Sequence, residues 1–159
     1  GPKAAEALYH MGHAYLAAKN YPEAKDAFEK LRAKTSEPEL LASAVEGLGL
    51  VAENEKDYNA ALAYYKEIVD KWPNTLVRHR QGLHMARVNE ELGNYADAVA
   101  AYQSVKKDYP AYAQDAQKAL DRLEKSHPEL FVQAEESTEP AGQPEAAVPP
   151  VDDVPETSK

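Results

Sequence analysis

The side chains best suited to chemistry in this 159-residue chain are its histidines, its carboxylates and one pair of close glycines. His10 and His13 lie three residues apart, a spacing that could bring two imidazoles to one side of a helix as metal ligands. No acidic partner or third ligand stands nearby in the sequence, and the metalloprotease pattern of two histidines around a glutamate is absent. We therefore interpret both as histidines of a groove and its rim, and expect neither a metal nor a cofactor.

Other catalytic patterns are missing from the sequence as well. The chain contains no cysteine, which excludes a disulfide scaffold, a thiolate zinc site and a cysteine nucleophile. Gly47-Leu48-Gly49 lacks the third glycine and the preceding strand of a nucleotide-binding loop, and there is no Gly-x-Ser-x-Gly elbow. The sequence therefore predicts a protein that is not an enzyme.

Composition limits the remaining classes. Hydrophobic residues make up 43% and charged residues 28%, as in globular domains, and no apolar run approaches the roughly 18 residues of a membrane span. A net charge of −9 argues against a nucleic-acid partner. Gly1-Pro2 resembles the scar of a cleaved expression tag, so we expect the chain to be a fragment of a longer protein. A signal peptide or membrane anchor upstream of the fragment is left open.

The C-terminal end differs from the rest of the chain. Residues 129–159 carry eight acidic residues, one base and five of the 11 prolines. Such a segment cannot bury enough apolar surface to offset its ordering entropy, so we expect 134–159 to be disordered within an acidic tail at 127–159. Three roles stay open for this tail: a solubilising linker, recognition of a basic partner, or docking on the fold through Leu130, Phe131 and Val132.

A repeat of 37 residues organises residues 5–125. Asn or Asp recurs just before an apolar helical pattern, where its side chain can cap a helix N-terminus. Small residues recur where two helices would approach closely, and aromatic residues recur where they would fill the space between them. The clearest columns are Asn20, Asp57 and Asn94; Gly12, Gly49 and Ala86; Ala24, Ala61 and Ala98; and Phe28, Tyr65 and Tyr102.

Each repeat unit is predicted to be a helical hairpin. Gly93 suits a left-handed position at the end of a helix, and Ser36-Glu37-Pro38-Glu39 matches a capping box with proline in the first turn. In the first helix, Leu8, Met11, Gly12 and Tyr15 form the expected core stripe. The predicted helices span 4–18, 21–34, 38–55, 58–71, 75–92, 95–108 and 112–125.

This set of columns resembles the tetratricopeptide repeat family. The resemblance implies an all-α, right-handed solenoid of three hairpins, with repeats at about 5–41, 42–78 and 79–115, and a capping helix at 112–125. It places a lead-in at 1–4 and the domain at 5–126. The 37-residue spacing, with Trp72-Pro73 and Tyr109-Pro110 ending two hairpins, resembles the bacterial cell-envelope subset, such as the Tol–Pal-associated cell-division coordinator and outer-membrane assembly lipoproteins. It implies a periplasmic or membrane-anchored location.

The resemblance also implies a concave groove, lined by the first helix of each hairpin, that binds peptides or helices. Apolar side chains in this stripe have no assigned place in the core and are expected to contact a partner, while charged ones are expected to set its register. Alternatively, the apolar ones contact neighbouring helices or the tail. The candidate groove residues are Tyr9, His13, Leu16, Glu46, Leu50, Glu53, Arg80, Leu83, His84 and Arg87.

We thus predict a non-catalytic scaffold that binds a protein or peptide ligand, with no nucleic acid and no direct membrane insertion. A chaperone-tail receptor does not fit, since only Arg80 with His84 suits that clamp, whereas Tyr9, His13 and Gly47 do not. The alternative is self-assembly, in which the uncapped N-terminal hairpin mediates homo-oligomerisation.

Overall fold

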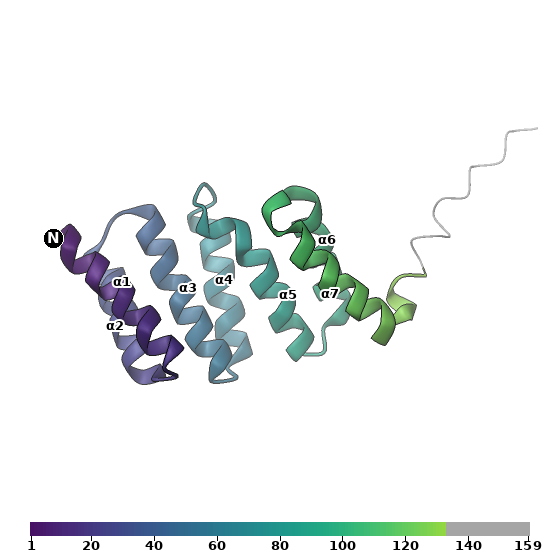
Figure 1. The fold of residues 1–159 in the computed structure, drawn as a ribbon, viewed down its shortest axis with the longest axis horizontal. Coiled ribbons are helices and arrows are strands. Elements are labelled where there is room, and N and C mark those ends of the chain that lie inside the picture. The colour runs from purple at the N-terminus through teal and green to yellow at the C-terminus, as the bar shows by residue number, and fades with distance from the viewer. Residues whose placement is uncertain (133–159) are drawn as a thin grey trace, which may run out of the picture.

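The computed structural model describes residues 1–132, and these fold into helical hairpins stacked side by side (Figure 1). Among the described residues there is no strand, which confirms the all-α solenoid. The elements are α1 (Pro2–Ala17), α2 (Tyr21–Lys34), α3 (Pro38–Asn54), α4 (Tyr58–Lys71), η1 (Val77–Arg80), α5 (Gln81–Glu91), α6 (Tyr95–Asp108), η2 (Pro110–Tyr112), α7 (Ala113–Ser126) and η3 (Pro128–Leu130).

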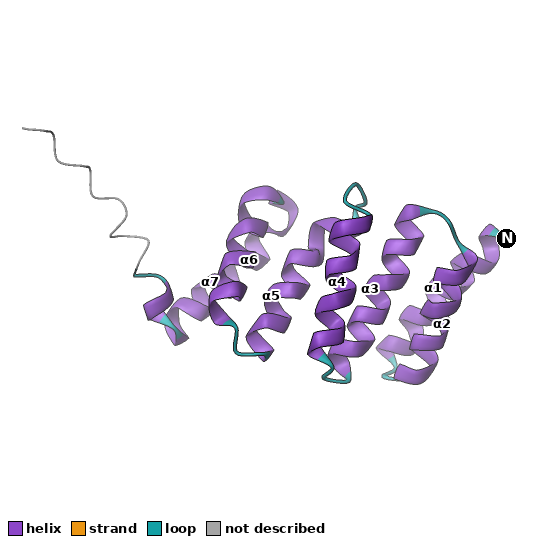
Figure 2. Cartoon of the chain, turned by 180° about the vertical axis from the view of Figure 1, so that it is seen from behind, coloured by secondary structure: helices purple, strands orange, loops and turns teal. Residues whose placement is uncertain are grey.

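The hairpins arrange their helices in two layers. Helices α1, α3, α5 and α7 form one layer, and α2, α4 and α6 form the other, which lies nearer in the reverse view (Figure 2). Each second helix packs both on the first helix of its own hairpin and on the first helix of the next. The core therefore runs along the array between the two layers.

The turns inside the three hairpins share one backbone conformation. Each has a residue with positive φ at the same repeat position: Lys19 (61°), Lys56 (64°) and Gly93 (76°). The second helices α2, α4 and α6 then begin and end at the predicted residues. Of the three predicted N-caps, only Asp57 uses its side chain, accepting a hydrogen bond of 3.2 Å from the Ala60 N–H.

Glycine and aromatic columns meet as expected. The rings of Phe28 and Tyr65 are fully buried. A Cβ added to Gly12 would lie 2.6 Å from the Phe28 ring, and one added to Gly49 would lie 2.5 Å from the Tyr65 ring. Because real Cβ atoms do not approach this closely, these two positions require glycine for the helices to pack at this separation.

Three details of the first helices differ from the predictions. The Ser36 capping box is wrong, because Glu39 reaches instead to the next repeat and accepts hydrogen bonds of 3.1 Å from the Leu76 and Val77 N–H groups. With its start held in this way, the helix predicted at 75–92 opens as the 3₁₀ turn η1 before α5. Helix α1 begins at Pro2, since proline suits a first helical turn.

Met11 is a fourth difference: it was predicted in the core but is 46% exposed, because no described helix lies over that side of α1.

The C-terminal end is closed by α7. This helix buries Ala116, Leu120 and Leu123. Beyond it, Leu130 and Phe131 pack against the same cluster, and the His127 ring stacks on Tyr95 at 3.9 Å, whereas Val132 is exposed. Docking is thus confirmed for two of the three apolar residues, and the predicted disordered segment 134–159 lies outside the described residues.

Candidate functional site

The groove prediction centres on the layer of first helices, where a carboxylate from α3 is almost completely buried. Glu46 is 3% exposed and accepts two hydrogen bonds of 2.6 Å from the Arg80 guanidinium. It also accepts hydrogen bonds of 2.9 Å from Gln81 and from His84. Burial by itself raises the pKa of Glu46, but the hydrogen bonds from His84 and Arg80 outweigh it and lower the pKa to about 2.

A second carboxylate lies two turns further along α3. Glu53 accepts hydrogen bonds of 2.5 and 2.8 Å from Arg87 and one of 2.7 Å from the Tyr65 hydroxyl. Burial and the neighbouring Glu53 charge raise the pKa of Tyr65, so its hydroxyl stays protonated and donates.

His84 joins these two ion pairs. Its Nδ1 lies 2.9 Å from an Arg87 nitrogen and its Nε2 lies 2.9 Å from Glu46. A guanidinium can only donate, so Nδ1 accepts from Arg87 and the Nε2–H donates to Glu46.

The third member connects α5 with α7. Glu90 accepts hydrogen bonds of 2.7 and 2.9 Å from Arg122 and one of 2.7 Å from the Tyr102 hydroxyl. Glu90 and Tyr102 are the 37-residue equivalents of Glu53 and Tyr65. We call Glu46, Glu53 and Glu90, with Arg80, Arg87 and Arg122, the carboxylate ladder.

The ladder gives the predicted groove charges an internal role. Glu46, Glu53, Arg80, His84 and Arg87 do come together, but they bind one another across the hairpins. That a partner also contacts them stays a prediction. Sequence reasoning missed the roles of Gln81, Arg122 and the tyrosine hydroxyls. A signal was available, because a glutamate precedes the core tyrosine by 12 residues in the second and third repeats.

The predicted apolar groove residues serve two purposes. Tyr9, Leu16, Leu50 and Leu83 are each half-buried, and each packs one side against a core cluster. Their remaining surface is exposed on the layer of first helices. The interpretation that they contact neighbouring helices therefore holds, and contact of their remaining surface with a partner stays a prediction.

His13 lies beside these residues. Its ring meets Tyr9 at 4.5 Å and Phe28 at 5.2 Å between centroids, and no described residue provides a hydrogen-bond partner for its buried Nε2. Burial of the ring lowers the pKa of His13 from its ordinary value. His10 is exposed, with its Nε2 3.9 Å from a Glu6 carboxylate oxygen and its ring centroid 5.3 Å from that of Tyr9. Across residues 1–132, no three histidine, aspartate or glutamate side chains are grouped closely enough to hold a metal.

One hollow lies at the α1 end of this layer. It has a volume of about 560 Å³ and lies between the start of α1 and the α2–α3 connection. Its lining includes Tyr9 and Leu40 with the charged residues Glu6, Lys34 and Glu37. Tyr9 therefore connects this hollow to the apolar residues of the candidate groove.

None of the described helices combines the length and the apolar character that crossing a bilayer requires.

Comparison with known proteins identifies the repeat. Two family models described as tetratricopeptide repeat match the chain, one over residues 9–74 and the other over residues 82–112. Among curated proteins, none matches it.

Proposed function

Because the chain belongs to the tetratricopeptide repeat family, whose repeats generally mediate protein–protein interactions, we propose that it is a non-catalytic scaffold that holds a peptide or helix of a partner protein. The binding surface is the exposed side of α1, α3 and α5.

The observation that carries this proposal is the set of partly exposed apolar side chains on one layer. Tyr9 and Leu16 come from α1, Leu50 from α3 and Leu83 from α5, so the set spans three hairpins. Isolated apolar side chains on a surface are ordinary, but a set spread along one layer offers a partner a row of anchors.

The carboxylate ladder limits which kinds of side chain the partner can use for binding. Each ladder carboxylate already accepts at least three hydrogen bonds from within the chain. A charged ligand would have to displace these bonds, and breaking one side of a buried ion pair is costly. The partner is therefore expected to bind through apolar side chains, arranged on an amphipathic helix or an extended peptide.

A paired-variant capture experiment tests this surface. Leu50→Glu with Leu83→Glu places two charges on the groove. Ala63→Glu with Ala100→Glu is the matched control, because both alanines are exposed on the other layer and occupy equivalent repeat positions. We expect proteins captured from a source lysate to be lost with the groove variant and kept with the control, with circular dichroism showing that both remain folded.

Capture of the same proteins by a folded groove variant would overturn the proposal. If the two leucine substitutions unfold the chain, Tyr9→Ser with Leu16→Gln tests the same surface at α1. A photo-reactive residue at position 9 then identifies which segment of the captured partner lies against it.

A cell-envelope context belongs to the same proposal. It is supported by the 37-residue spacing and by the Trp72-Pro73 and Tyr109-Pro110 hairpin ends, and fractionation of the source cells tests it.

A further inference from the structure

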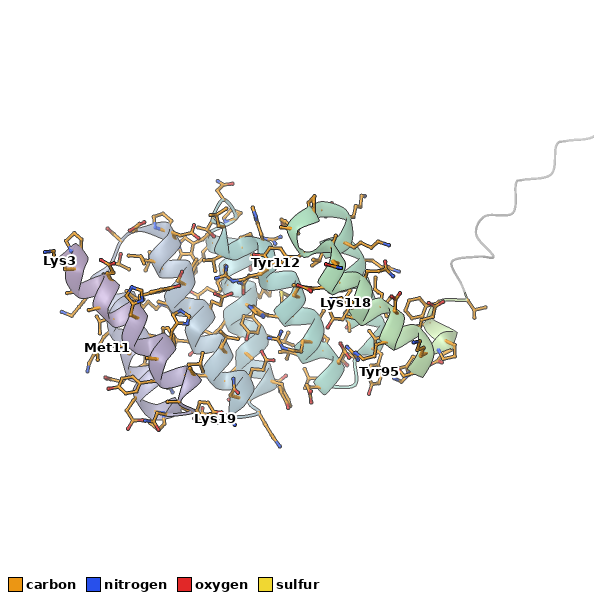
Figure 3. All side chains as sticks on the ribbon, in the orientation of Figure 1. Lys3, Met11, Lys19, Tyr95, Tyr112 and Lys118 are labelled. Atoms are coloured by element: carbon orange, nitrogen blue, oxygen red, sulfur yellow. The ribbon has the colours of Figure 1, made fainter. Side chains whose placement is uncertain are left out.

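The connection between α4 and α5 holds the most exposed large apolar side chain among residues 1–132. Leu76 is 70% exposed, more than Val132 or Met11. The connection spans 72–76 and projects from the edge of the array (Figure 1), and its side chains reach out beyond the helices (Figure 3). By contrast, the α2–α3 connection spans only 35–37 and contains no large apolar residue.

Hydrogen bonds brace this connection. The Glu39 carboxylate, from the start of α3, accepts hydrogen bonds of 3.1 Å from the Leu76 and Val77 N–H groups. Within the connection, the Thr75 hydroxyl donates a hydrogen bond of 2.8 Å to the Trp72 carbonyl. Single exposed leucines are ordinary on a protein surface, but a leucine that is held outward by a braced backbone loses little conformational freedom when a partner binds.

A hollow of about 430 Å³ lies between this connection and the start of α3. Its apolar lining includes Trp72, the single tryptophan of the chain, which is half-buried and packs against a core cluster. Aromatic residues in such hollows are common anchors of protein interfaces. The name loop edge is used for Pro38, Trp72, Pro73 and Leu76 together with the carboxylates of Glu37 and Glu39.

The rim of the hollow carries negative charge that the described chain does not compensate. Glu37 is exposed, and the Glu39 carboxylate accepts its hydrogen bonds from uncharged N–H groups. Within residues 1–132, no basic side chain forms an ion pair with either carboxylate. Lys71 also lines the hollow, but its ammonium is bound to Glu67 at 2.8 Å. A partner therefore meets an apolar hollow with unmatched negative charge beside it.

The basic residues of η1 do not supply the missing charge. The Arg78 guanidinium lies 5.3 Å from the centre of the Tyr109 ring, and the His79 ring lies 5.1 Å from the same ring. Both side chains thus pack toward the end of α6. The complementary cation has to come from the molecule that binds.

Charge also disfavours two occupants that the chain itself could provide. Residues 133–159 carry seven acidic residues and one base, so the carboxylates of the loop edge repel them. Two copies that met edge to edge about a two-fold axis would bring Glu37 and Glu39 of both copies together. Neither occupant matches the chemistry of this surface.

From these observations we infer that the loop edge is a docking surface for a segment of another protein in which a large apolar side chain stands next to a lysine or arginine. The apolar side chain enters the hollow against Trp72 and contacts Leu76, and the cation lies against Glu37 and Glu39. This surface lies where α3 and α5 begin, whereas the candidate groove runs along the exposed side of α1, α3 and α5. The scaffold therefore has a second binding place that does not depend on the groove.

Selection of short random peptides, displayed on phage, against the full chain tests the inference. We expect a class of enriched peptides that carry a leucine, isoleucine or phenylalanine next to lysine or arginine. Synthetic copies of these peptides are expected to change the fluorescence of Trp72 on titration. This signal reports on the hollow specifically, because the chain contains no other tryptophan.

Paired variants assign the binding to the loop edge. Leu76→Ser and Glu37→Lys are each expected to weaken peptide binding about tenfold, since one removes the apolar anchor and the other repels the cation. Glu55→Lys is the matched control, because it makes the same charge change at an exposed position at the other end of α3. It is expected to bind as the original chain does, and circular dichroism checks that all three variants are folded.

The groove variant, Leu50→Glu with Leu83→Glu, is expected to keep this binding, which separates the loop edge from the proposed groove. Peptide binding that Leu76→Ser and Glu37→Lys leave unchanged would overturn the inference. Enrichment of acidic peptides, or of none that shift the Trp72 signal, would overturn it too. An average mass that rises with concentration and returns to monomer in Leu76→Ser would assign the surface to a second copy instead.

Discussion

The first and second junctions between hairpins use the same repeat positions with opposite chemistry. We define the first junction as the contact of α1 and α2 with α3, and the second as the contact of α3 and α4 with α5. In the first, Leu16 packs against the cluster that contains Phe28. In the second, the equivalent residues are Glu53 and Tyr65, joined by a hydrogen bond of 2.7 Å.

The neighbouring position differs in the same sense. Gly47 of the first junction lies so close to Phe28 that an added Cβ would come within 2.5 Å of the ring. Its equivalent in the second junction is His84, whose ring lies 4.9 Å from the Tyr65 ring and hydrogen-bonds to two charged residues. One junction is held by close apolar packing, the other by a hydrogen-bonded network.

This comparison teaches that the residues of a junction work as a set. An apolar neighbour goes with phenylalanine, and a carboxylate goes with tyrosine, because a buried hydroxyl needs an acceptor and a buried carboxylate needs donors. A change to one member should therefore cost much more than a matched change to both.

The largest expected effect is at the centre of the second junction. Glu46→Ala leaves Arg80, Gln81 and His84 without their shared acceptor, so unfolding free energy should fall by about 3 to 4 kcal/mol in urea titrations. Glu55→Ala is the control, because Glu55 is exposed at the end of the same helix and should change stability by less than about 0.5 kcal/mol. Equal losses of unfolding free energy in the Glu46→Ala and Glu55→Ala variants would show that the hydrogen-bonded network does not stabilise the second junction.

Acid should weaken the second junction in particular. The pKa of Glu46 is about 2 in the fold and near its ordinary value of 4.5 in the unfolded chain. Its contribution is therefore complete above about pH 5 and is lost as the pH falls toward 2, which amounts to about 3 kcal/mol. Glu46→Gln cannot titrate, so its urea midpoint should fall less between pH 5 and pH 2.5 than that of the original chain. Parallel falls in the two proteins would contradict the assignment.

A transfer of residues between the junctions tests the matched-set idea. Phe28→Tyr should destabilise the fold by about 2 kcal/mol, since its hydroxyl meets no carboxylate. Adding Leu16→Glu should recover at least about 1 kcal/mol of that loss in a double-mutant cycle, because the new carboxylate can accept a hydrogen bond from the new hydroxyl. Additive losses of unfolding free energy would mean that the side chains at positions 16 and 28 do not interact in the first junction.

The smallest effect extends the comparison to the hairpin turns. The first two turns hold Lys19 and Lys56 at positive φ, where the third has Gly93. Lys56→Gly should raise the free energy of unfolding by about 1 kcal/mol, because glycine adopts this conformation without a Cβ clash. Gly93→Lys should lower it by a similar amount, and thermal unfolding of both variants measures the pair. A destabilising Lys56→Gly would mean that the lysine side chain compensates for the backbone strain.

Much of the fold could be predicted from the sequence because its determinants are local or periodic. The bounds of α2, α4 and α6 follow from turn and capping residues, and the contact of Gly12 with Phe28 follows from columns that repeat every 37 residues. The start of α5 is harder to predict from the sequence, because the segment before it is held by a residue of another hairpin. The Glu39 carboxylate accepts hydrogen bonds from the Leu76 and Val77 N–H groups.

The sequence predicts which residues lie together in the candidate site better than it predicts the contacts between them. Glu46, Glu53, Arg80 and Arg87 were assigned to one surface, and they share it, but their mutual pairing was not predicted. The sequence did not reveal the role of Arg122, because α7 does not follow the 37-residue repeat. Arg122 lies 32 residues after its partner Glu90, whereas Arg87 lies 34 residues after its partner Glu53.

By itself, the sequence determined the hairpin unit, the glycine and aromatic columns and the layer that carries the candidate groove. These depend on helix periodicity and on side chains within one repeat length. Only the tertiary structure decided that the groove charges neutralise one another and that Met11 lies outside the core. Both outcomes depend on how closely one hairpin approaches the next, and on whether another helix covers its outer side.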